Sequence, residues 1–355
     1  MKAGVKVFSG MSVKDHPTII DDKHSPDLSN CRVDNPLGAL SNMEGISKYN
    51  SVGFGASIVA IHQLNGHIFS LRGGSAGSAS GKLYEGRIFE GYTAITNCVE
   101  LQAMQNDLAG NYYLANDIDC TYCTQDPAGA LYNAGAGFAP VGDYSNPFTG
   151  TFDGNEHTIT GLKINRPSTA YIGLFSYING AEIKNVGLIN IDITGDHNIG
   201  GLVADIRPPD ANIINNCYVT GSVSGNGGSI GGLLGMQNRR AITITNCYTT
   251  CSVSTGANYA GGLIGYNDGY GNDDTITNCY SAGAISGSNV GGLIGYNSAG
   301  TYNDCFWDTQ TSGQATSGGG TGKTTAQMKQ QATFENWNFS TIWAIVEDVS
   351  YPTLR

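Results

Sequence analysis

The seven residues GGLIGYN occur at 261–267 and again, unchanged, at 291–297. When the chain is aligned on the Gly-Leu step of this segment, five copies appear at spacings of 28, 31, 30 and 30 residues, with these leucines: Leu174, Leu202, Leu233, Leu263 and Leu293. A unit of about 30 residues that recurs this evenly is typical of proteins that stack one small structural unit on the next. We therefore expect a repeat protein over this region.

A second line of residues runs in phase with the first. It reads IKNVG, INNCY, ITNCY and ITNCY, and it brings four asparagines to one repeat position: Asn185, Asn216, Asn246 and Asn278. Asparagine is common in turns, and stacked asparagine side chains can hydrogen-bond to one another. The pattern predicts an asparagine ladder along one turn of the stacked units.

Each repeat holds three short apolar segments, G-G-L-I-G, I-T-N-C-Y and S-V-S, which are separated by residues that favour turns. They are rich in Val, Ile, Thr and Tyr, and none is long enough for an ordinary helix. Three strands per repeat match one coil of a parallel β-helix, whereas a propeller blade needs four strands and about 40–45 residues. We predict an all-β fold, a right-handed parallel β-helix, in which the Gly-Gly step allows close backbone approach or positive φ.

The two ends of the chain lack the repeat. Residues 1–91 are predicted to form a small β domain that anchors the molecule, with a hairpin around Asn65-Gly66. Residues 92–310 form the β-helix, and residues 311–355 form a glycine-rich link and a C-terminal cap. In that cap the aromatic side chains of Trp337, Phe339 and Trp343 are expected to close the open end of the coil.

The nine cysteines fall into two kinds of position. Four lie at equivalent repeat positions and are expected to form a column of buried free thiols: Cys217, Cys247, Cys279 and Cys305. Cys120 and Cys123 form a lone CxxC motif, for which a local disulfide or plain packing is expected rather than zinc, because zinc needs a second pair of ligands.

Charge excludes several partners. The formal net charge is −11, only 13% of the residues are charged, and 51 are glycine. Without a basic patch, neither nucleic acid nor an anionic membrane surface is an expected partner. The first twenty residues hold no apolar run of the length that a secretory signal needs, and no run approaches a membrane span. We expect a protein made in the cytoplasm of its host, without a signal peptide and without membrane insertion.

Catalytic and metal-binding signals are weak. The segment GGGTGKTT lacks the preceding strand and the spacing of a phosphate-binding loop. Five acidic residues lie in repeat turns but at different repeat positions: Asp196, Asp205, Asp268, Asp273 and Asp274. His157 and His197 are isolated. We predict no catalytic residues, no cofactor and no metal, with calcium at Asn267–Asp274 kept as an alternative because that stretch is rich in oxygen ligands.

The tyrosines give the candidate binding site. Tyr218, Tyr248 and Tyr280 share one repeat position, and Tyr266 and Tyr296 share another. Stacked aromatic side chains on a β-helix can simply pack on each other. Alternatively, tyrosine and asparagine side chains can form a flat binding face that suits sugar rings. We predict binding by these five tyrosines together with Asn267 and Asp268.

The G-G-L-[IVL]-G and N-C-Y lines together resemble the GLUG-motif family of β-helical surface and phage tail proteins. Residues 101–120 and 137–167 resemble the entry coils of such proteins, so that the resemblance covers about residues 95–310. The first 90 residues loosely resemble virion proteins of tailed phages.

The resemblance implies a structural component of a phage tail or tail tip, located in the virion. Such a component would attach to other virion proteins through residues 1–91, contact host cell-surface polysaccharide and assemble as a homo-oligomer. Two alternatives remain open, a bacterial surface adhesin and a polysaccharide-degrading tailspike enzyme.

Overall fold

The structure is a computed structural model of the 355-residue chain. It describes the strands between residues 11 and 87 and residues 89–355, apart from 208–209, 239–240 and 269–273. The contacts divide the chain into two units, Met1–Glu90 and Gly91–Arg355. No helix in the described part of the chain is long and apolar enough to cross a membrane.

The strands that the structure describes in the first unit form two antiparallel sheets. One pairs β1 (Met11–Val13) with β2 (Cys31–Val33). The other is a meander of β3 (Ile58–Leu64), β4 (His67–Arg72) and β5 (Lys82–Arg87). Leu64 pairs with His67, which confirms the hairpin predicted around Asn65-Gly66. The anchoring role of residues 1–91 stays a prediction.

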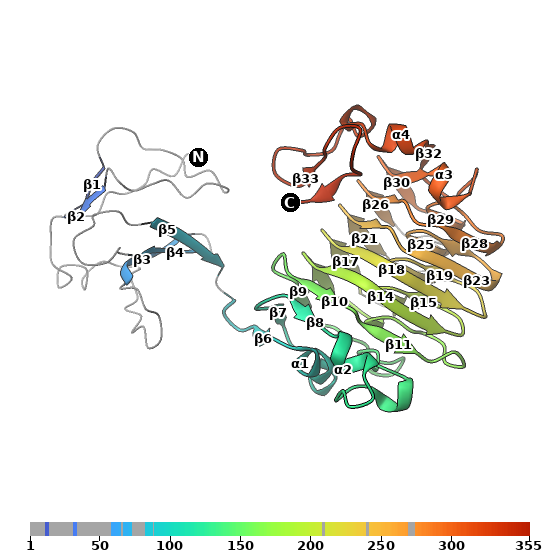
Figure 1. The fold of residues 1–355 in the computed structure, drawn as a ribbon, viewed down its shortest axis with the longest axis horizontal. Helices are drawn as coiled ribbons and strands as arrows, with labels where there is room; N and C mark the ends of the chain where they lie inside the picture. The colour runs from blue at the N-terminus through green and yellow to red at the C-terminus, as the bar shows by residue number, and fades with distance from the viewer. Residues whose placement is uncertain are drawn as a thin grey trace. The chain divides into compact units, whose positions relative to one another are not determined.

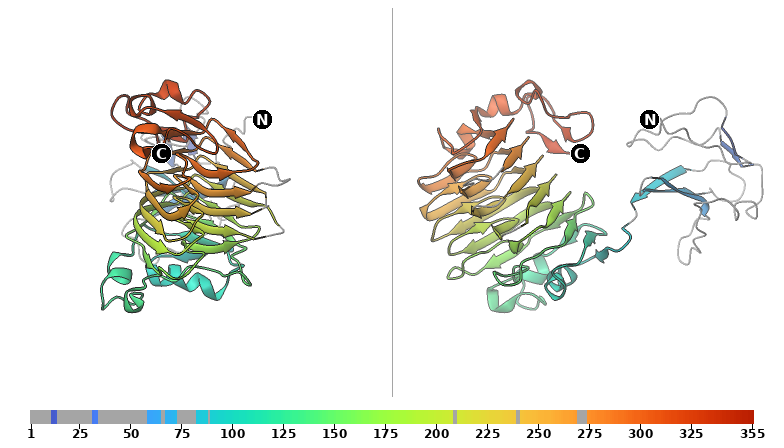
Figure 2. Two further views of the ribbon diagram at one scale, coloured as in Figure 1. Left: turned by 90° about the vertical axis from the view of Figure 1, so that its right-hand side faces the viewer. Right: turned by 180° about the vertical axis from the view of Figure 1, so that it is seen from behind.

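The second unit is a parallel β-solenoid of about five turns, which confirms the predicted fold class. Figure 1 and Figure 2 show its strands stacked rung upon rung from green to orange. Three long sheets and one short corner sheet surround the core, and in the repeats the chain visits them in the order II, corner, III and I. Strands on neighbouring coils pair in parallel, so hydrogen bonds run along the axis.

Sheet I carries the Ile-Thr line, and its strands in chain order are β6 (Thr93–Ile95), β7 (Tyr112–Leu114), β9 (Thr151–Asp153), β13 (Glu182–Lys184), β17 (Asn212–Asn215), β21 (Ile242–Thr245), β26 (Thr275–Thr277) and β30 (Thr301–Asn303). Sheet III carries the Leu-Ile-Gly line, and its strands are β12 (Phe175–Ile178), β16 (Val203–Ile206), β20 (Leu234–Asn238), β25 (Ile264–Asp268) and β29 (Ile294–Asn297).

Sheet II carries the Cys-Tyr and Ser-Val-Ser lines, and its strands are β8 (Ile118–Asp119), β10 (Thr158–Thr160), β11 (Lys163–Asn165), β14 (Gly187–Gly195), β18 (Tyr218–Gly225), β22 (Tyr248–Thr249), β23 (Ser252–Asn258), β27 (Tyr280–Ser281), β28 (Ile285–Ser288), β31 (Phe306–Asp308) and β32 (Thr321–Lys323). The corner sheet consists of β15 (Ile199–Gly200), β19 (Ile230–Gly231) and β24 (Ala260–Gly261).

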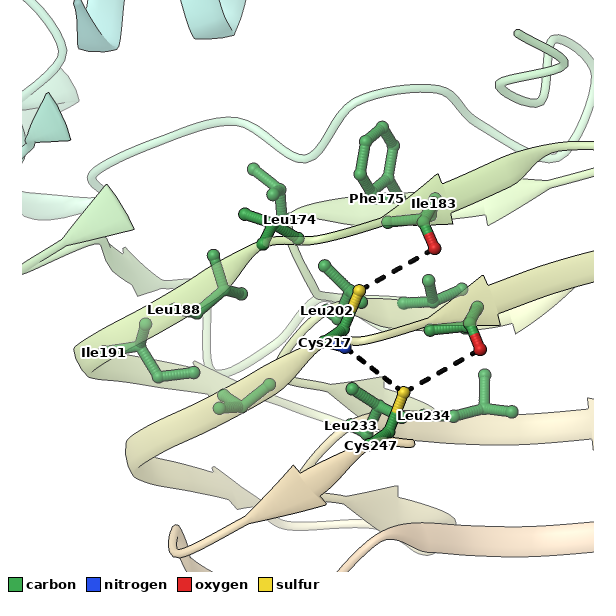
Figure 3. Packing of buried hydrophobic residues seen from close by; sticks show 14 of the residues in the cluster. Leu174, Phe175, Ile183, Leu188, Ile191, Leu202, Cys217, Leu233, Leu234 and Cys247 are labelled. Atoms are coloured by element: carbon green, nitrogen blue, oxygen red, sulfur yellow. Dashed lines mark hydrogen bonds between the residues drawn. The ribbon is translucent and has the colours of Figure 1, made fainter. Parts of the chain in front are cut away.

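The core contains the predicted columns. All five repeat leucines are fully buried. The four predicted thiols are free and buried, and the backbone N–H of Cys217 donates to Cys247 Sγ, as Figure 3 shows. Each thiol also donates to a carbonyl oxygen of the preceding coil, as Cys217 does to Ile183. Burial raises the pKa of the Cys217 thiol, which keeps it protonated and unreactive.

The Gly-Gly step is required for close approach. A Cβ on Gly231 would lie 2.0 Å from the Leu234 carbonyl oxygen, and one on Gly232 would lie 2.2 Å from the Gly262 carbonyl oxygen. Neither glycine has a positive φ. Of the two explanations that the sequence offered, backbone contact between the corner and the next coil is therefore the correct one.

The asparagine ladder forms as predicted. All four asparagines have φ between 51° and 54°, the left-handed conformation that asparagine tolerates. Each Nδ2 donates to an Oδ1 on the preceding coil: Asn185 to Asp153, Asn216 to Asn185, Asn246 to Asn216 and Asn278 to Asn246. The ladder therefore fixes the register of every coil at the turn between sheets I and II.

Helices close the first end of the solenoid. α1 (Cys98–Ala103) and the 3₁₀ turn η3 (Met104–Asn106) bury Leu101 and Met104 in the core, and Asn97 caps α1. α2 (Thr121–Gln125) and the 3₁₀ turn η4 (Asn133–Gly135) follow, and α1 and α2 lie at the bottom of Figure 1. A disulfide joins Cys98 to Cys120, and Cys123 is a free thiol. The local Cys120–Cys123 disulfide considered from the sequence is therefore wrong.

The glycine-rich segment closes the other end. The backbone N–H of Gly318 donates to the Ile294 carbonyl, and that of Thr321 donates to the Cys305 carbonyl. β32 then pairs in parallel with β31. Residues 316–323 are thus a last partial coil rather than the link that the sequence predicted. The elements around it are α3 (Thr309–Ser312), α4 (Thr325–Met328), the 3₁₀ turn η5 (Gln331–Thr333), β33 (Trp343–Ala344) and β34 (Thr353–Leu354).

Candidate functional site

The first set of tyrosines forms a regular stack on the outside of sheet II. Tyr218, Tyr248 and Tyr280 pair in register on β18, β22 and β27. Their ring centroids are 4.9 and 5.0 Å apart, and successive ring planes differ by 1° and 3°. The spacing follows directly from the rise of one coil, since neighbouring strands are about 4.8 Å apart.

A C-terminal arm, residues 325–355, covers most of this stack. Met328, Phe334, Trp337 and Trp343 form a second hydrophobic cluster with Tyr248 and Tyr280. Tyr280 is 1% exposed, Tyr248 is 7% exposed, and burial raises the pKa of both phenols. The arm therefore removes these two tyrosines from the predicted binding face.

The same arm corrects the prediction for the C-terminal aromatic residues. Trp337 and Trp343 lie against the side of sheet II and not over the end of the coil, and Phe339 packs beside them. The reason is that the partial coil already closes the end, which leaves the uncovered tyrosine stack as the apolar surface that the arm can bury.

Tyr218 lies at the edge of the arm and remains half-buried. A cavity of about 190 Å³ opens there between the sheet and the arm. Its wall includes Asn185, Asn216 and Tyr218 from the solenoid and Ile342, Leu354 and Arg355 from the arm. The two asparagine side chains belong to the hydrogen-bonded ladder, so their amides hold the coil register.

The second set of tyrosines remains on the surface, on the outside of sheet III. Tyr266 and Tyr296 stack with centroids 4.7 Å apart and a 13° angle between the rings. Tyr259, at the corner before β24, contacts both at 5.4 and 5.2 Å. Tyr296 is 37% exposed, and Tyr259 and Tyr266 are half-buried. These three residues, which we call the upper tyrosine cluster, present aromatic surface to solvent.

The sequence did not identify Tyr259. It has a positive φ of 67° and occupies the repeat position of Tyr171, Asn198, Ser229 and Asn289, which also have positive φ. A search for the residue that precedes the corner strand in every repeat would have found it. The side chain varies along this column because only the backbone conformation is repeated.

The two polar residues predicted to bind have different surroundings. Asn267 is fully buried, and its Nδ2 is within hydrogen-bonding distance of the Tyr302 hydroxyl and the Ala299 carbonyl, at 2.6 and 3.1 Å. It therefore fixes the corner after sheet III and cannot meet a ligand at the surface. Asp268 is half-buried and accepts a hydrogen bond from Ser298 Oγ at 2.9 Å.

The acidic residues do not share one rung. Asp205 lies on β16, where it pairs with Tyr177 and Met236. Asp274 is buried at a corner and accepts from Gln237 Nε2 and the Ile242 backbone N–H. Asp273 lies outside the described residues. Asp205 therefore lies within sheet III, whereas Asp274 lies at the corner before β26.

The two histidines are not isolated, contrary to the prediction. His157 Nδ1 lies 3.4 Å from Asp117 Oδ1, and His197 Nδ1 lies 2.9 Å from Asp196 Oδ2. His197 also contacts the ring of Tyr171 edge-on at 5.5 Å. Both histidines are half-buried. The His157–Asp117 pair links two coils, whereas His197 and Asp196 are neighbours in the sequence.

Metal ligands do not cluster in the part of the chain that the structure describes. No group of three or more His, Cys, Asp or Glu side chains that could hold a metal ion occurs there. Most of the calcium alternative, Asn267–Asp274, lies in the stretch 269–273 outside the described residues. That alternative stays a prediction.

In a comparison with protein families, the model of the N-terminal region of M26 IgA1-specific metallo-endopeptidases matches residues 90–221. Halomucin of Haloquadratum walsbyi is 34% identical over 148 residues, which are 40% of this chain. The immunoglobulin A1 protease of Streptococcus sanguinis is 30% identical over 143 residues, again 40% of this chain. The matched segments are 2% and 7% of these two relatives, so the chain resembles a small part of each.

A crystal structure of a candidate immunoglobulin A1 protease from Bacteroides ovatus has the same fold. It superimposes with a TM-score of 0.50 at 20% identity, over 76% of this chain and 93% of that one. At that identity the likeness shows the β-solenoid fold alone. The solenoid is thus shared with a candidate IgA1 protease, and its first coils resemble the N-terminal region of the M26 endopeptidases.

Proposed function

We propose that this chain is a β-solenoid recognition module of a surface protein, and that the upper tyrosine cluster binds carbohydrate. The cluster is the observation that carries the proposal. It presents three tyrosine rings within 5.4 Å of one another at the surface of a rigid sheet. Rigid aromatic side chains give large contact area at little entropic cost, and their flat faces suit sugar rings.

Two further findings support presentation outside the cell. The matching family model describes the N-terminal region of the M26 endopeptidases, and the matched segment makes up a small share of two much longer relatives. The Cys98–Cys120 disulfide is of the kind that persists in oxidising surroundings. Both support the alternative of a bacterial surface adhesin.

The other predictions from the sequence remain untested. They are the tail component of a virion, its contacts with virion proteins through residues 1–91, the homo-oligomer and the polysaccharide-degrading enzyme. Binding to cell-surface polysaccharide is common to the adhesin and the tail component.

A panel of immobilised polysaccharides tests the proposal with the full chain. We expect at least one neutral polysaccharide to retain the protein, and the triple variant Tyr259→Ala/Tyr266→Ala/Tyr296→Ala to bind at least tenfold more weakly, since one aromatic contact in a binding site is worth about 1–2 kcal/mol. Tyr122→Ala is the matched control, because Tyr122 is 64% exposed on α2. Equal binding by the triple variant and the control would refute the proposal.

A further inference from the structure

Sheet III carries one outward column of side chains along the axis. The register places Tyr177, Asp205, Met236, Tyr266 and Tyr296 on successive rungs, from β12 to β29. None of these five belongs to the main core cluster. The column therefore has aromatic side chains at both ends and non-aromatic side chains on the two rungs between them.

The lower end of the column is a second aromatic group, which we call the lower tyrosine cluster: Tyr144, Tyr171 and Tyr177. Tyr177 contacts Tyr171 at 4.9 Å and Tyr144 edge-on at 5.7 Å. The guanidinium of Arg207 lies 3.5 Å from the centre of the Tyr144 ring. Tyr177 is only 4% exposed, but Tyr144 is 60% exposed and Tyr171 is half-buried, so Tyr144 and Tyr171 supply the aromatic surface of this cluster.

Tyr177 and Tyr266 lie three rung spacings apart, with two rungs between them. Neighbouring strands lie about 4.8 Å apart, so this separation is about 14 Å along the axis. The intervening rungs hold Asp205 and Met236, and the adjacent corner positions hold Asn198 and Ser229. Asn198 Nδ2 donates to Met236 Sδ at 3.1 Å, which ties the corner to the column.

Asp205 is the unusual residue between the clusters. It is only 7% exposed, and among the described residues its single hydrogen bond is the one that Oδ1 accepts from the Ile206 backbone N–H, at 2.7 Å. No side chain in the described part of the chain donates to Oδ2. A carboxyl group that is this deeply buried normally has its hydrogen-bonding capacity filled. The arrangement therefore points to a donor or acceptor that comes from outside the chain.

We propose that the outside of sheet III is a track for an extended, uncharged polysaccharide that lies parallel to the solenoid axis. The two tyrosine clusters stack on sugar rings about three rungs apart, and the Asp205 carboxyl group hydrogen-bonds to hydroxyl groups between them. This proposal rests on the proposed function and names its ligand class and direction. The net charge of −11 and the buried carboxyl group both disfavour an anionic polymer.

The protonation of Asp205 supports an uncharged ligand. Burial raises the pKa of this carboxyl group to about 7, although the Arg207 charge opposes the shift. The titratable groups nearest to Asp205 are Tyr177, which pairs with it across the sheet, then Tyr171 beside Tyr177, and the Asp196–His197 pair against Tyr171. A ligand that covers Asp205 removes more water from it, which favours the protonated form further. Binding therefore takes up a proton, and affinity falls as the pH rises through 7.

Length dependence tests the track. Oligosaccharides are cut from the neutral polysaccharide that the panel identifies, and their affinities for the full chain are measured from the disaccharide upward. We expect affinity to rise steeply until the oligosaccharide spans about 14 Å and then to level off, because the second cluster adds an intramolecular contact. Tyr144→Ala should weaken the spanning oligosaccharide about tenfold, and the disaccharide far less, while Tyr122→Ala changes neither.

Asp205→Asn gives an independent readout. The amide resembles the protonated carboxyl group in shape and cannot ionise. If binding raises the pKa of Asp205 by one further unit, the wild-type affinity falls about tenfold as the pH rises from below the pKa of the free protein to above that of the complex. We expect the variant to bind with an affinity that no longer depends on pH between 6 and 8.

The outcomes separate the two proposals. If Tyr144→Ala and Asp205→Asn leave the affinity, its length dependence and its pH dependence unchanged while the upper-cluster variants weaken binding, then the track is wrong and the proposed function stands. If no neutral polysaccharide binds the full chain at all, the proposed function fails, and the track fails with it.

Discussion

The hydroxyl of Tyr280 donates a hydrogen bond of 2.7 Å to the carbonyl oxygen of Pro352, 72 residues further along the chain. This contact fastens the C-terminal arm to the tyrosine stack of sheet II. It shows that a column of identical side chains need not be a binding face. The stack on sheet II is the surface against which the arm folds, and the smaller group of tyrosines on sheet III stays at the surface.

Removing this hydroxyl should loosen the arm without disturbing the coils. In Tyr280→Phe the ring still packs, but the buried Pro352 carbonyl loses its donor, which costs about 1–3 kcal/mol. We expect hydrogen exchange to accelerate in residues 325–355 and to stay unchanged in sheets I and III. Uniformly faster exchange through the solenoid would show instead that the arm and the coils unfold as one unit.

The leucine column should hold several coils together. Leu263 is fully buried, and Leu263→Asp places a carboxylate among apolar side chains, at a cost of several kcal/mol. We expect a large fall in the urea midpoint or the loss of folded protein. Ile213→Asp is the matched control, because Ile213 is 42% exposed on β17 and should change stability little. Similar urea midpoints for the two variants would contradict the inward position of this column.

The asparagine ladder combines two effects that substitution can separate. Asn246 has a φ of 53°, and its amide bonds to Asn216 and Asn278. Asn246→Ala loses the hydrogen bonds and also strains the backbone, by about 1–2 kcal/mol, whereas Asn246→Gly loses only the hydrogen bonds. We therefore expect chemical denaturation to show a higher free energy of unfolding for Asn246→Gly than for Asn246→Ala. The reverse order would mean that the left-handed backbone is not what selects asparagine here.

Asp205 should make stability depend on pH. The pKa of this carboxyl group is raised to about 7 in the folded protein, above its usual value near 4, so the folded state binds more protons than the unfolded state between these values. Stability should therefore fall as the pH rises from about 4 to 7, by an amount on the order of 3 kcal/mol. Asp205→Asn should remove this slope. If Asp205→Asn keeps the wild-type dependence of stability on pH, that dependence comes from another titratable group.

The repeating features were predictable from the sequence because each coil contacts its neighbours at equivalent positions. Leu263, Asn246 and Cys247 recur at about 30 residues, and a residue that recurs at the coil length must stack on its own copies. Burial, free thiols and the asparagine turn followed from that stacking alone. The hairpin around Asn65-Gly66 was predictable for a different reason, since the turn residues select it locally.

The missed features all depend on contacts that do not repeat. The arm covers Tyr248 and Tyr280 through an apolar cluster that has no period, so the sequence could not show which tyrosines remain at the surface. Cys120 pairs with Cys98 because the α1 cap brings them together, and sequence spacing pointed to Cys123 instead. The surroundings of Asp205 depend on the register of sheet III, where each rung carries a different outward side chain.

Isothermal titration with the polysaccharide that binds most tightly tests the central claim most directly. Tyr266→Ala/Tyr296→Ala removes two stacked rings from sheet III, and Tyr218→Ala removes one from the edge of the sheet II stack. We predict that the double variant binds at least tenfold more weakly than wild type, while Tyr218→Ala binds as wild type does and only melts at a lower temperature. Loss of affinity in Tyr218→Ala together with unchanged affinity in the double variant would contradict the assignment of sheet III as the binding face.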